Sequence, residues 1–374
     1  MADVSHVAQS GVLAERLTRA AAATREAGLD ALLVTPGPDL VYLTGYRAVP
    51  LERLTCLVLP AQAPASLVVP FLEVAAAAAS PVSGLPVAIV GWRETEDPYG
   101  LVASLLPDCR SVGLDDTMAA AKVLGLRDAL PGVSQSLASR VLRDLRMRKD
   151  AAEVDALREA GATIDRVHAR VGEWLRPGRT EAEVGRDIAD AILAEGHARV
   201  DFVIVASGPN GASPHHELSE RVIQPGDPVV VDIGGTMPSG YCSDSTRTYS
   251  VGAPPPDFAA YYEVLREAQA AAVRHVRPGV SAESVDAAAR SVIAAAGYGE
   301  QFIHRTGHGI GLETHEEPYI VSGNGEQVDA GMAFSVEPGI YVPGSHGARI
   351  EDIVVVTTDG VESLNNQPHE LVVL

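Results

Sequence analysis

The sequence predicts two domains, an α/β domain over residues 1–145 and an α+β domain over residues 146–374 built from a duplicated αα-ββ unit. Helix and strand signals alternate through the first domain. In the second domain, helices followed by strands occur twice. The strings PGRTEAEV (177–184) and PGVSAESV (278–285) are alike, and their separation of roughly 100 residues indicates an internal duplication.

The first domain begins with a helical pattern over residues 12–28, ended by Gly28 as a C-cap. Short apolar runs then predict strands, and the stretch AQAPA between two of them predicts a hairpin. No phosphate loop and no dinucleotide fingerprint occurs in this domain. Its expected strands are residues 29–36, 54–60, 66–70, 86–92 and 111–116.

A charged region over residues 134–175 contains the expected domain boundary, and we expect it to be helical throughout. Its basic cluster RMRKD (146–150) is expected to be a solvated junction between the domains. Two helix-then-strand groups follow. The expected helices are residues 181–196, 258–276 and 281–297, and the expected strands are residues 199–208, 228–235, 240–251, 333–342, 348–357 and 370–374.

Composition narrows the class of protein. The 49 acidic and 29 basic residues give a formal charge of −20, which disfavours binding to nucleic acid or to an anionic membrane. The three cysteines form no CxxC pair, which disfavours a disulfide framework and a thiolate zinc site. The N-terminal residues do not resemble a secretory signal, and no apolar run of about 18 residues occurs, so we expect a cytoplasmic protein.

The stretch HRTGHGIGLETHEEP (304–318) holds three of the eleven histidines. A helical pair of zinc-binding histidines would need Glu directly after the first His. Arg305 stands there instead, and the three glycines at 307, 309 and 311 would each disfavour a helix by about 1 kcal/mol. We therefore expect extended or looped chain in which glycine allows a close approach.

Four carboxylates stand in or beside apolar strand patterns, namely Asp232, Asp244, Glu337 and Glu351. Any one of them could be a turn or cap residue. Burying all four is costly, because like charges raise one another's pKa, and one or two divalent cations would relieve that cost. Carboxylate oxygens with one imidazole suit Mn, Fe, Co or Zn, and His308 is the natural nitrogen ligand.

The strings VDIGGTMPSGYCSDSTRT, HRTGHGIGLETHEEP, FSVEPGIY and ARIED together resemble the prolidase and aminopeptidase P family of metallopeptidases. The resemblance covers nearly the whole chain and is greatest to short bacterial Xaa-Pro dipeptidases. It implies a creatinase-like N-terminal domain, a pita-bread catalytic domain and a homodimer. It also implies hydrolysis of the peptide bond before proline in a small peptide by a water that bridges two metals, with manganese expected first.

The resemblance also assigns roles to residues. The implied metal ligands are Asp232, Asp244, His308, Glu337 and Glu351. Asp244 and Glu351 would bridge two ions about 3.5–4 Å apart. Glu337 would also accept and donate the proton.

Four further residues are implied to act on the substrate, namely His215, His304, His315 and Arg349. His315 would hydrogen-bond near the scissile carbonyl, and His304 would lie near the proline side. Arg349 would support Glu351 or meet the substrate carboxylate. The roles of His216 and Tyr341 stay open.

One departure from the family pattern concerns the first two acids. Asp232 and Asp244 stand one residue further apart than is usual in the family, and we expect the extra residue at a hairpin tip or a bulge within GTMPSG. Cys242, two residues before Asp244, is interpreted as a packed thiol and not as a ligand.

Two other functions are considered. The first is an aminopeptidase P that trims longer peptides, and the second is a non-enzymatic pita-bread binding protein. Methionine aminopeptidase shares the metal ligands, but its bacterial type lacks the large N-terminal domain. Creatinase shares the fold without the metal ligands, so the presence of all five ligands, four acids and His308, disfavours it.

Overall fold

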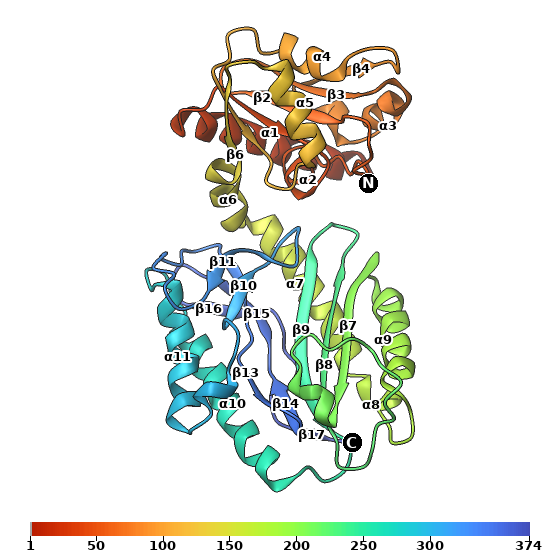
Figure 1. The fold of residues 1–374 in the computed structure, drawn as a ribbon, viewed down its shortest axis with the longest axis vertical. Coiled ribbons are helices and arrows are strands. Elements are labelled where there is room, and N and C mark those ends of the chain that lie inside the picture. The colour runs from red at the N-terminus through yellow and green to blue at the C-terminus, as the bar shows by residue number, and fades with distance from the viewer. Residues whose placement is uncertain (1) are drawn as a thin grey trace. The chain divides into compact units, whose positions relative to one another are not determined.

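The computed structural model describes residues 2–374, which form two compact units, one ending at Arg146 and one spanning Met147–Leu374 (Figure 1). The division lies one residue from the boundary expected from the sequence. No helix in the described part of the chain is both long enough and apolar enough to span a bilayer.

The first unit is an α/β domain around one six-stranded sheet, in the order β4-β3-β2-β1-β5-β6. Strand β2 runs antiparallel to β1 and β3, so the expected hairpin is confirmed, and the remaining neighbours pair in parallel. The elements are α1 (Ala2–Glu26), β1 (Ala31–Val34), α2 (Pro38–Thr44), β2 (Cys56–Pro60), β3 (Ala65–Pro70), α3 (Val74–Ala78), β4 (Val87–Trp92), α4 (Pro98–Ser104), β5 (Ser111–Leu114), α5 (Ala120–Ala129), β6 (Ser134–Leu137) and α6 (Ser139–Met147).

The end of α1 shows how the sequence specifies a boundary. Gly28 has a φ of 72°, and the amides of Gly28 and Leu29 donate back to the carbonyls of Arg25 and Thr24. This is the hydrogen-bond pattern of a glycine that ends a helix in the left-handed conformation. The predicted C-cap at Gly28 is confirmed.

The second unit holds two sheets with helices packed against each. The first sheet has the order β17-β9-β8-β7, the second has the order β11-β10-β12-β15-β16, and β13 and β14 form a separate hairpin. The elements are α7 (Ala151–His168), α8 (Val171–Trp174), α9 (Glu181–Glu195), β7 (Arg199–Ser207), β8 (Pro228–Thr236), β9 (Cys242–Ser250), α10 (Pro256–His275), α11 (Ala282–Ala295), β10 (Gly307–Gly309), β11 (Glu316–Ile320), β12 (Ala333–Val336), β13 (Gly339–Val342), β14 (His346–Arg349), β15 (Asp352–Val356), β16 (Val361–Ser363) and β17 (Val372–Val373).

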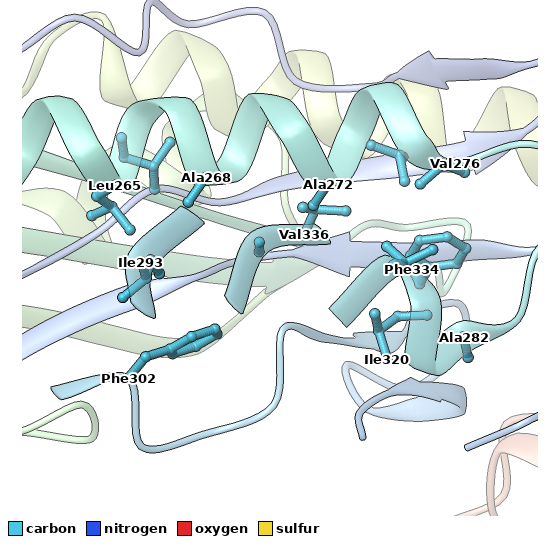
Figure 2. Close-up of a cluster of buried hydrophobic side chains, with 14 of the residues drawn as sticks. Leu265, Ala268, Ala272, Val276, Ala282, Ile293, Phe302, Ile320, Phe334 and Val336 are labelled. Carbon is cyan, nitrogen blue, oxygen red and sulfur yellow. The ribbon is translucent and has the colours of Figure 1, made fainter. Parts of the chain in front are cut away.

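Each sheet buries one face under its own helices. In the first half, Ile164 of α7 and Ile188 of α9 pack with Val231 of β8. In the second half, α10 and α11 cover the other sheet, and Figure 2 shows Leu265 of α10 and Ile293 of α11 in the same buried cluster as Phe334 of β12. These buried layers fix the strands whose opposite faces carry the candidate ligands.

The predicted duplication is visible in the backbone at the start of the second helix of each half. Gly178 and Gly279 have φ values of 87° and 85°, and their amides donate to Ile223 and Val328. Directly afterwards, the N-cap residues Thr180 and Ser281 each form an isolated antiparallel bridge. The two PG strings therefore begin the same local structure twice.

The expectation of one helical region over residues 134–175 is wrong. The region starts with the edge strand β6, and its helical part is broken between α6 and α7. Asp150 caps α7 in a capping box with Glu153, and this box starts a new helix because it satisfies free amides at the N-terminus.

The expectation of a solvated RMRKD cluster is also wrong in part. Lys149 is buried, and its Nζ lies 3.1 Å from Oε2 of Glu316, another buried group. Its backbone amide donates to the carbonyl of Gly331. The chain between α6 and α7 is thus held by the second half of its own unit.

Two expected strands are each divided by the carboxylate they contain. Glu337 lies between β12 and β13, and Glu351 lies between β14 and β15. In the first half, by contrast, Asp232 lies within β8 and Asp244 within β9.

Candidate active site

The two acids of the first half share one face of their sheet. In the antiparallel pair β8–β9, Asp232 lies opposite Thr246 and Asp244 lies opposite Gly234. Residues two apart in a strand point to the same face, so both carboxylates project together. The pairing of β8 with β9 contains no shift, which places the extra residue of this spacing in the tip over residues 237–241.

The second half supplies the other three candidate ligands. His308 lies in β10, and Glu337 and Glu351 lie at the two strand breaks. Glu351 connects the halves, because its amide donates to the carbonyl of Thr246 at 3.1 Å. The Thr246 hydroxyl in turn donates to Oε2 of Glu351 at 2.7 Å.

These residues converge on one cluster. Ligand atoms of Asp244, His308 and Glu351 all lie within 4.8 Å of one another. Nε2 of His308 is 3.6 Å from Asp244 Oδ2 and 3.3 Å from Glu337 Oε1. Nδ1 of His308 lies 3.1 Å from the carbonyl of Gly309, so it carries the proton and leaves the Nε2 lone pair facing the acids.

The electrostatics of the cluster are unfavourable without a cation. Burial and the carboxylates around them raise the pKa values of Asp244 and Glu351 well above their ordinary range. Burial also raises the pKa of Glu337 to about 7. Burial and the neighbouring His315 lower the pKa of His308 to about 3, so this imidazole is neutral.

The donor set therefore fits divalent metal ions. Buried carboxylates with one neutral imidazole are suitable ligands, and a cation offsets the repulsion that raises their pKa values. Asp232 adds a second observation, because its Oδ1 is buried without a hydrogen-bond partner in the described part of the chain. That oxygen is free to accept a metal ion.

A cavity of about 1000 Å³ opens onto the cluster. All five candidate ligands line it, together with the four candidate substrate residues. Among these, His215 and His315 are exposed, and the ring centroid of His315 lies 4.0 Å from that of His308. The further lining residues are Asp201, Phe202, Val203, Ile204, Pro214, His216, Glu217, Leu218, Arg305 and Thr314.

Arg349 contacts Asp232 directly and reaches Glu351 through Thr246. Its Nη2 lies 2.5 Å from Oδ2 of Asp232. Its Nε donates to the Thr246 hydroxyl at 3.2 Å, and that hydroxyl donates to Glu351. Nη1 donates to the Tyr341 hydroxyl at 2.8 Å. Arg349 therefore orients Asp232 and leaves that residue's other oxygen to the cavity.

Tyr341 continues this chain of contacts to His304. Burial and the charge of Arg349 lower the pKa of His304 to about 4, so the ring is neutral. Nδ1 donates to the carbonyl of Arg305 at 2.7 Å, which makes Nε2 the acceptor for the Tyr341 hydroxyl at 2.9 Å. The Tyr341 hydroxyl therefore joins His304 to Arg349.

The glycines on either side of His308 are needed for close packing of the backbone. A Cβ on Gly307 would collide with the carbonyl oxygen of Ser335, and one on Gly309 would collide with the carbonyl oxygen of Glu317. Glycine therefore allows β10 to lie tightly between β11 and β12. This close approach holds His308 in place.

Three features near the site were not found by sequence reasoning. Thr246 bonds Glu351, and Arg305 lines the cavity with its guanidinium 4.4 Å from the ring of Tyr319. Glu181 is buried beside the loop of His215. Arg305 was readable as a cation within the HRTGHGIG string, whereas the other two depend on contacts between distant segments.

Two residues left outside the site are also placed by the structure. His216, adjacent to His215, donates Nε2–H toward Glu181 at 2.8 Å. Cys242 is buried among apolar side chains, and burial raises the pKa of its thiol to about 11. The interpretation of Cys242 as a packed thiol is confirmed.

Comparison with known proteins defines the class. Residues 155–358 match metallopeptidase family M24, and residues 16–148 match the creatinase/prolidase N-terminal domain. The chain therefore belongs to the M24 family of metallopeptidases and is an enzyme. The creatinase-like first domain and the pita-bread second domain expected from the resemblance are confirmed.

Individual relatives cover almost the whole chain. A protein named probable dipeptidase PepE from Mycobacterium tuberculosis is 59% identical over 364 residues, which is 97% of each chain. An Xaa-Pro dipeptidase from Lactobacillus helveticus is 38% identical over 341 residues, covering 89% of this chain and 92% of the relative. The crystal structure of dipeptidase PepE from Mycobacterium ulcerans aligns with a TM-score of 0.94 at 60% identity, covering 97% of this chain and 98% of the other.

Proposed function

We propose that this protein is a dipeptidase that hydrolyses the bond before a C-terminal proline in Xaa-Pro dipeptides. The observation that carries the proposal is the buried cluster of carboxylates around a neutral His308, at the base of a cavity of about 1000 Å³. The two relatives named as dipeptidases, at 59% and 38% identity, support the substrate class.

The metal-binding residues in this proposal are Asp232, Asp244, His308, Glu337 and Glu351, which would hold two divalent cations. When bound, the cations polarise the scissile carbonyl and lower the pKa of a water molecule so that it can attack. Manganese is the first choice, because hard carboxylate oxygens with a single imidazole suit it.

Glu337 is the group best suited to move the proton. Its Oε1 lies 3.3 Å from Nε2 of His308, so this carboxylate stands among the candidate ligands, where it would accept a proton from the attacking water and pass it on. Oε1 also accepts a hydrogen bond from the Ser335 hydroxyl at 3.0 Å, which fixes the carboxylate. The proline nitrogen leaves as a secondary amine and needs one proton, which Glu337 would deliver.

Two exposed histidines would bind the peptide. The cavity walls partly desolvate His315, and this desolvation and the nearby Arg305 lower its pKa, so the neutral ring can donate a hydrogen bond to the oxygen that becomes negative during attack. His215 lines the same cavity and would hold the substrate near the metals. Arg305 supplies a positive charge at the cavity wall that suits the carboxylate of a short peptide.

The test is proline release by the manganese-loaded protein. Leu-Pro, Leu-Ala and Leu-Pro-Gly would be supplied separately, and the products followed by mass spectrometry. Release of proline from Leu-Pro alone supports the dipeptidase. Cleavage of Leu-Pro-Gly would instead indicate an aminopeptidase P, and failure to cut either proline peptide with metal bound would refute the proposal.

The homodimer and the cytoplasmic location stay predictions. The three cysteines are free, and those at positions 56 and 242 are buried, which suits a reducing compartment.

A further inference from the structure

A buried carboxylate that takes no part in the metal cluster lies at the start of α9. Glu181 follows the N-cap Thr180 and is 0% exposed. A carboxylate in such a position is costly unless hydrogen-bond donors satisfy it. The identity of those donors indicates what Glu181 does.

The hydrogen-bond donors to Glu181 come from one short segment, residues 207–219. Oε1 accepts from the amide and the hydroxyl of Ser207 at 2.7 and 2.6 Å, and from Nδ2 of Asn210 at 3.0 Å. Oε2 accepts from Nε2 of His216 at 2.8 Å and from the hydroxyl of Ser219. Ser207 and Ser219 flank the loop over residues 208–218, and Asn210 and His216 lie within it.

These bonds keep Glu181 charged. Burial alone would raise its pKa, but the hydrogen bonds from Ser207, Ser219 and His216 outweigh burial and lower it. Hydrogen bonds to an ionised acceptor are about twice as strong as neutral ones. One carboxylate thus ties a loop that has no regular strand pairing.

The loop bears on the metal cavity at two points. His215 is exposed at the cavity, while its neighbour His216 is held by Glu181. The carbonyl of Pro214 accepts from Nη1 of Arg349 at 3.3 Å, and Arg349 also contacts Asp232. The anchored residue and the cavity residue are therefore consecutive in the chain.

We propose that Glu181 is a positioning residue that holds the loop over residues 208–218 so that His215 faces the metal cavity. The inference rests on the proposed function, because His215 touches substrate only if the cavity binds a peptide. A residue acting through His215 should lose its effect when His215 is absent, whereas one that only stabilises the fold should not.

The experiment is a double-mutant cycle on the full chain with manganese, using Glu181→Gln, His215→Ala and the double variant. Glu181→Gln keeps the shape but turns one acceptor into a donor that faces donors. We expect it to lower kcat/KM for Leu-Pro about tenfold, mainly through KM, when His215 is present. In the His215→Ala background we expect less than about twofold, with manganese affinity unchanged in all variants.

Asp286→Asn in the second half is the matched control. Asp286 is also buried, and it accepts from the amide and hydroxyl of Thr306 much as Glu181 accepts from Ser207. Its other hydrogen-bond partner is Arg290 of the same helix, and not a residue of the loop of His215. Its effect on kcat/KM should therefore be the same factor with and without His215.

Ser219→Ala, which removes one donor, keeps the test open if Glu181→Gln does not fold. Its loss of kcat/KM should also depend on the presence of His215, but should be smaller than that of Glu181→Gln. Equal losses in both backgrounds, or an unchanged kcat/KM in the variants of Glu181 and Ser219, would overturn the proposal.

Hydrogen exchange separates this inference from the proposed function. If the parent protein cleaves no Xaa-Pro peptide, the proposed function fails, but amides over residues 208–218 should still exchange faster in Glu181→Gln than in the parent. Unchanged exchange over that segment would overturn the anchoring role itself.

Discussion

The two halves of the unit Met147–Leu374 begin alike and then place their acids differently. Gly178 and Gly279 make the same turn before the second helix of each half. In the first half Asp232 and Asp244 lie within continuously paired strands, whereas in the second half Glu337 and Glu351 lie at strand breaks. The duplicated backbone thus brings candidate metal ligands from both halves to one cluster, from within strands in the first half and from strand breaks in the second.

Removing one ligand from each half should have the largest effect. If the centre is shared, Asp244→Asn and Glu351→Gln should each weaken metal binding and lower kcat/KM by well over about 100-fold, more than the loss of an outer partner. Metal content by mass spectrometry and proline release would measure this. Glu362→Gln, which alters a surface pair with Arg158, is the control and should change neither. Retention of metal and activity by one of the two ligand variants would assign the centre to a single half.

The second largest effect is expected from a substitution in the closely packed backbone of the second half. Gly307→Ala should destabilise the fold by about 2 kcal/mol or more, because the new methyl group meets the carbonyl of Ser335 and backbone cannot easily move. Gly325→Ala, where no atom lies within 4 Å of the added carbon, should stay within about 0.5 kcal/mol. Urea unfolding of the two variants measures the difference, and equal midpoints would contradict the packing argument.

Metal removal should expose the charge of Glu337. Its folded pKa of about 7 lies above the ordinary 4.5, so its contribution to stability is complete below about 4.5 and is lost as pH rises through 7. The buried histidines have lowered pKa values and act in the opposite direction, but only below about 6.5. Between pH 6.5 and 8 the metal-free protein should therefore lose about 0.8 kcal/mol of stability.

Thermal melts with and without manganese test this expectation. The stabilisation by manganese should be larger at pH 8 than at pH 6.5, by about 2 °C, because the cation replaces the proton that Glu337 has lost. Glu337→Gln should remove part of the pH dependence of the metal-free form. An equal shift at both pH values would show that the carboxylates are not repelling one another.

The helix caps should give the smallest effect and sharpen the comparison of the halves. Thr180 accepts from the amide of Glu183 in a full capping box, whereas Ser281 makes no side-chain cap bond. Thr180→Ala should therefore cost about 1 kcal/mol, and Ser281→Ala only a few tenths. Denaturant midpoints of the two variants measure this, and a larger loss at Ser281 would reverse the expected order.

Much of the architecture could be predicted because its signals are local. Gly28 marked a helix end, and the two PG strings marked the duplication. The break before α7 was also local, since Asp150 and Glu153 form a readable capping box, but the helical periodicity on both sides concealed it. Local signals therefore predict elements well unless two of them compete.

The hydrogen bonds and ion pairs within the candidate site could not be predicted, because their partners lie far apart in the sequence. The sequence pointed to the acids and to His308, which the structure gathers around one cavity. It did not reveal that Arg349 pairs with Asp232 or that Glu181 bonds His216, since those partners lie 117 and 35 residues apart. Charge and hydropathy along a chain show that a buried acid needs a partner, but not which partner it takes.

The contact between Thr246 and Glu351 has a consequence for the order of events during unfolding. These residues are 105 positions apart in the chain, and they lie at the seam between the two sheets. An ion bound there by Asp244 and Glu351 would act as a removable cross-link across that seam. In the unfolded chain such a link would close a very long loop at a large entropic cost. Parting of the two sheets should therefore require release of the ion first.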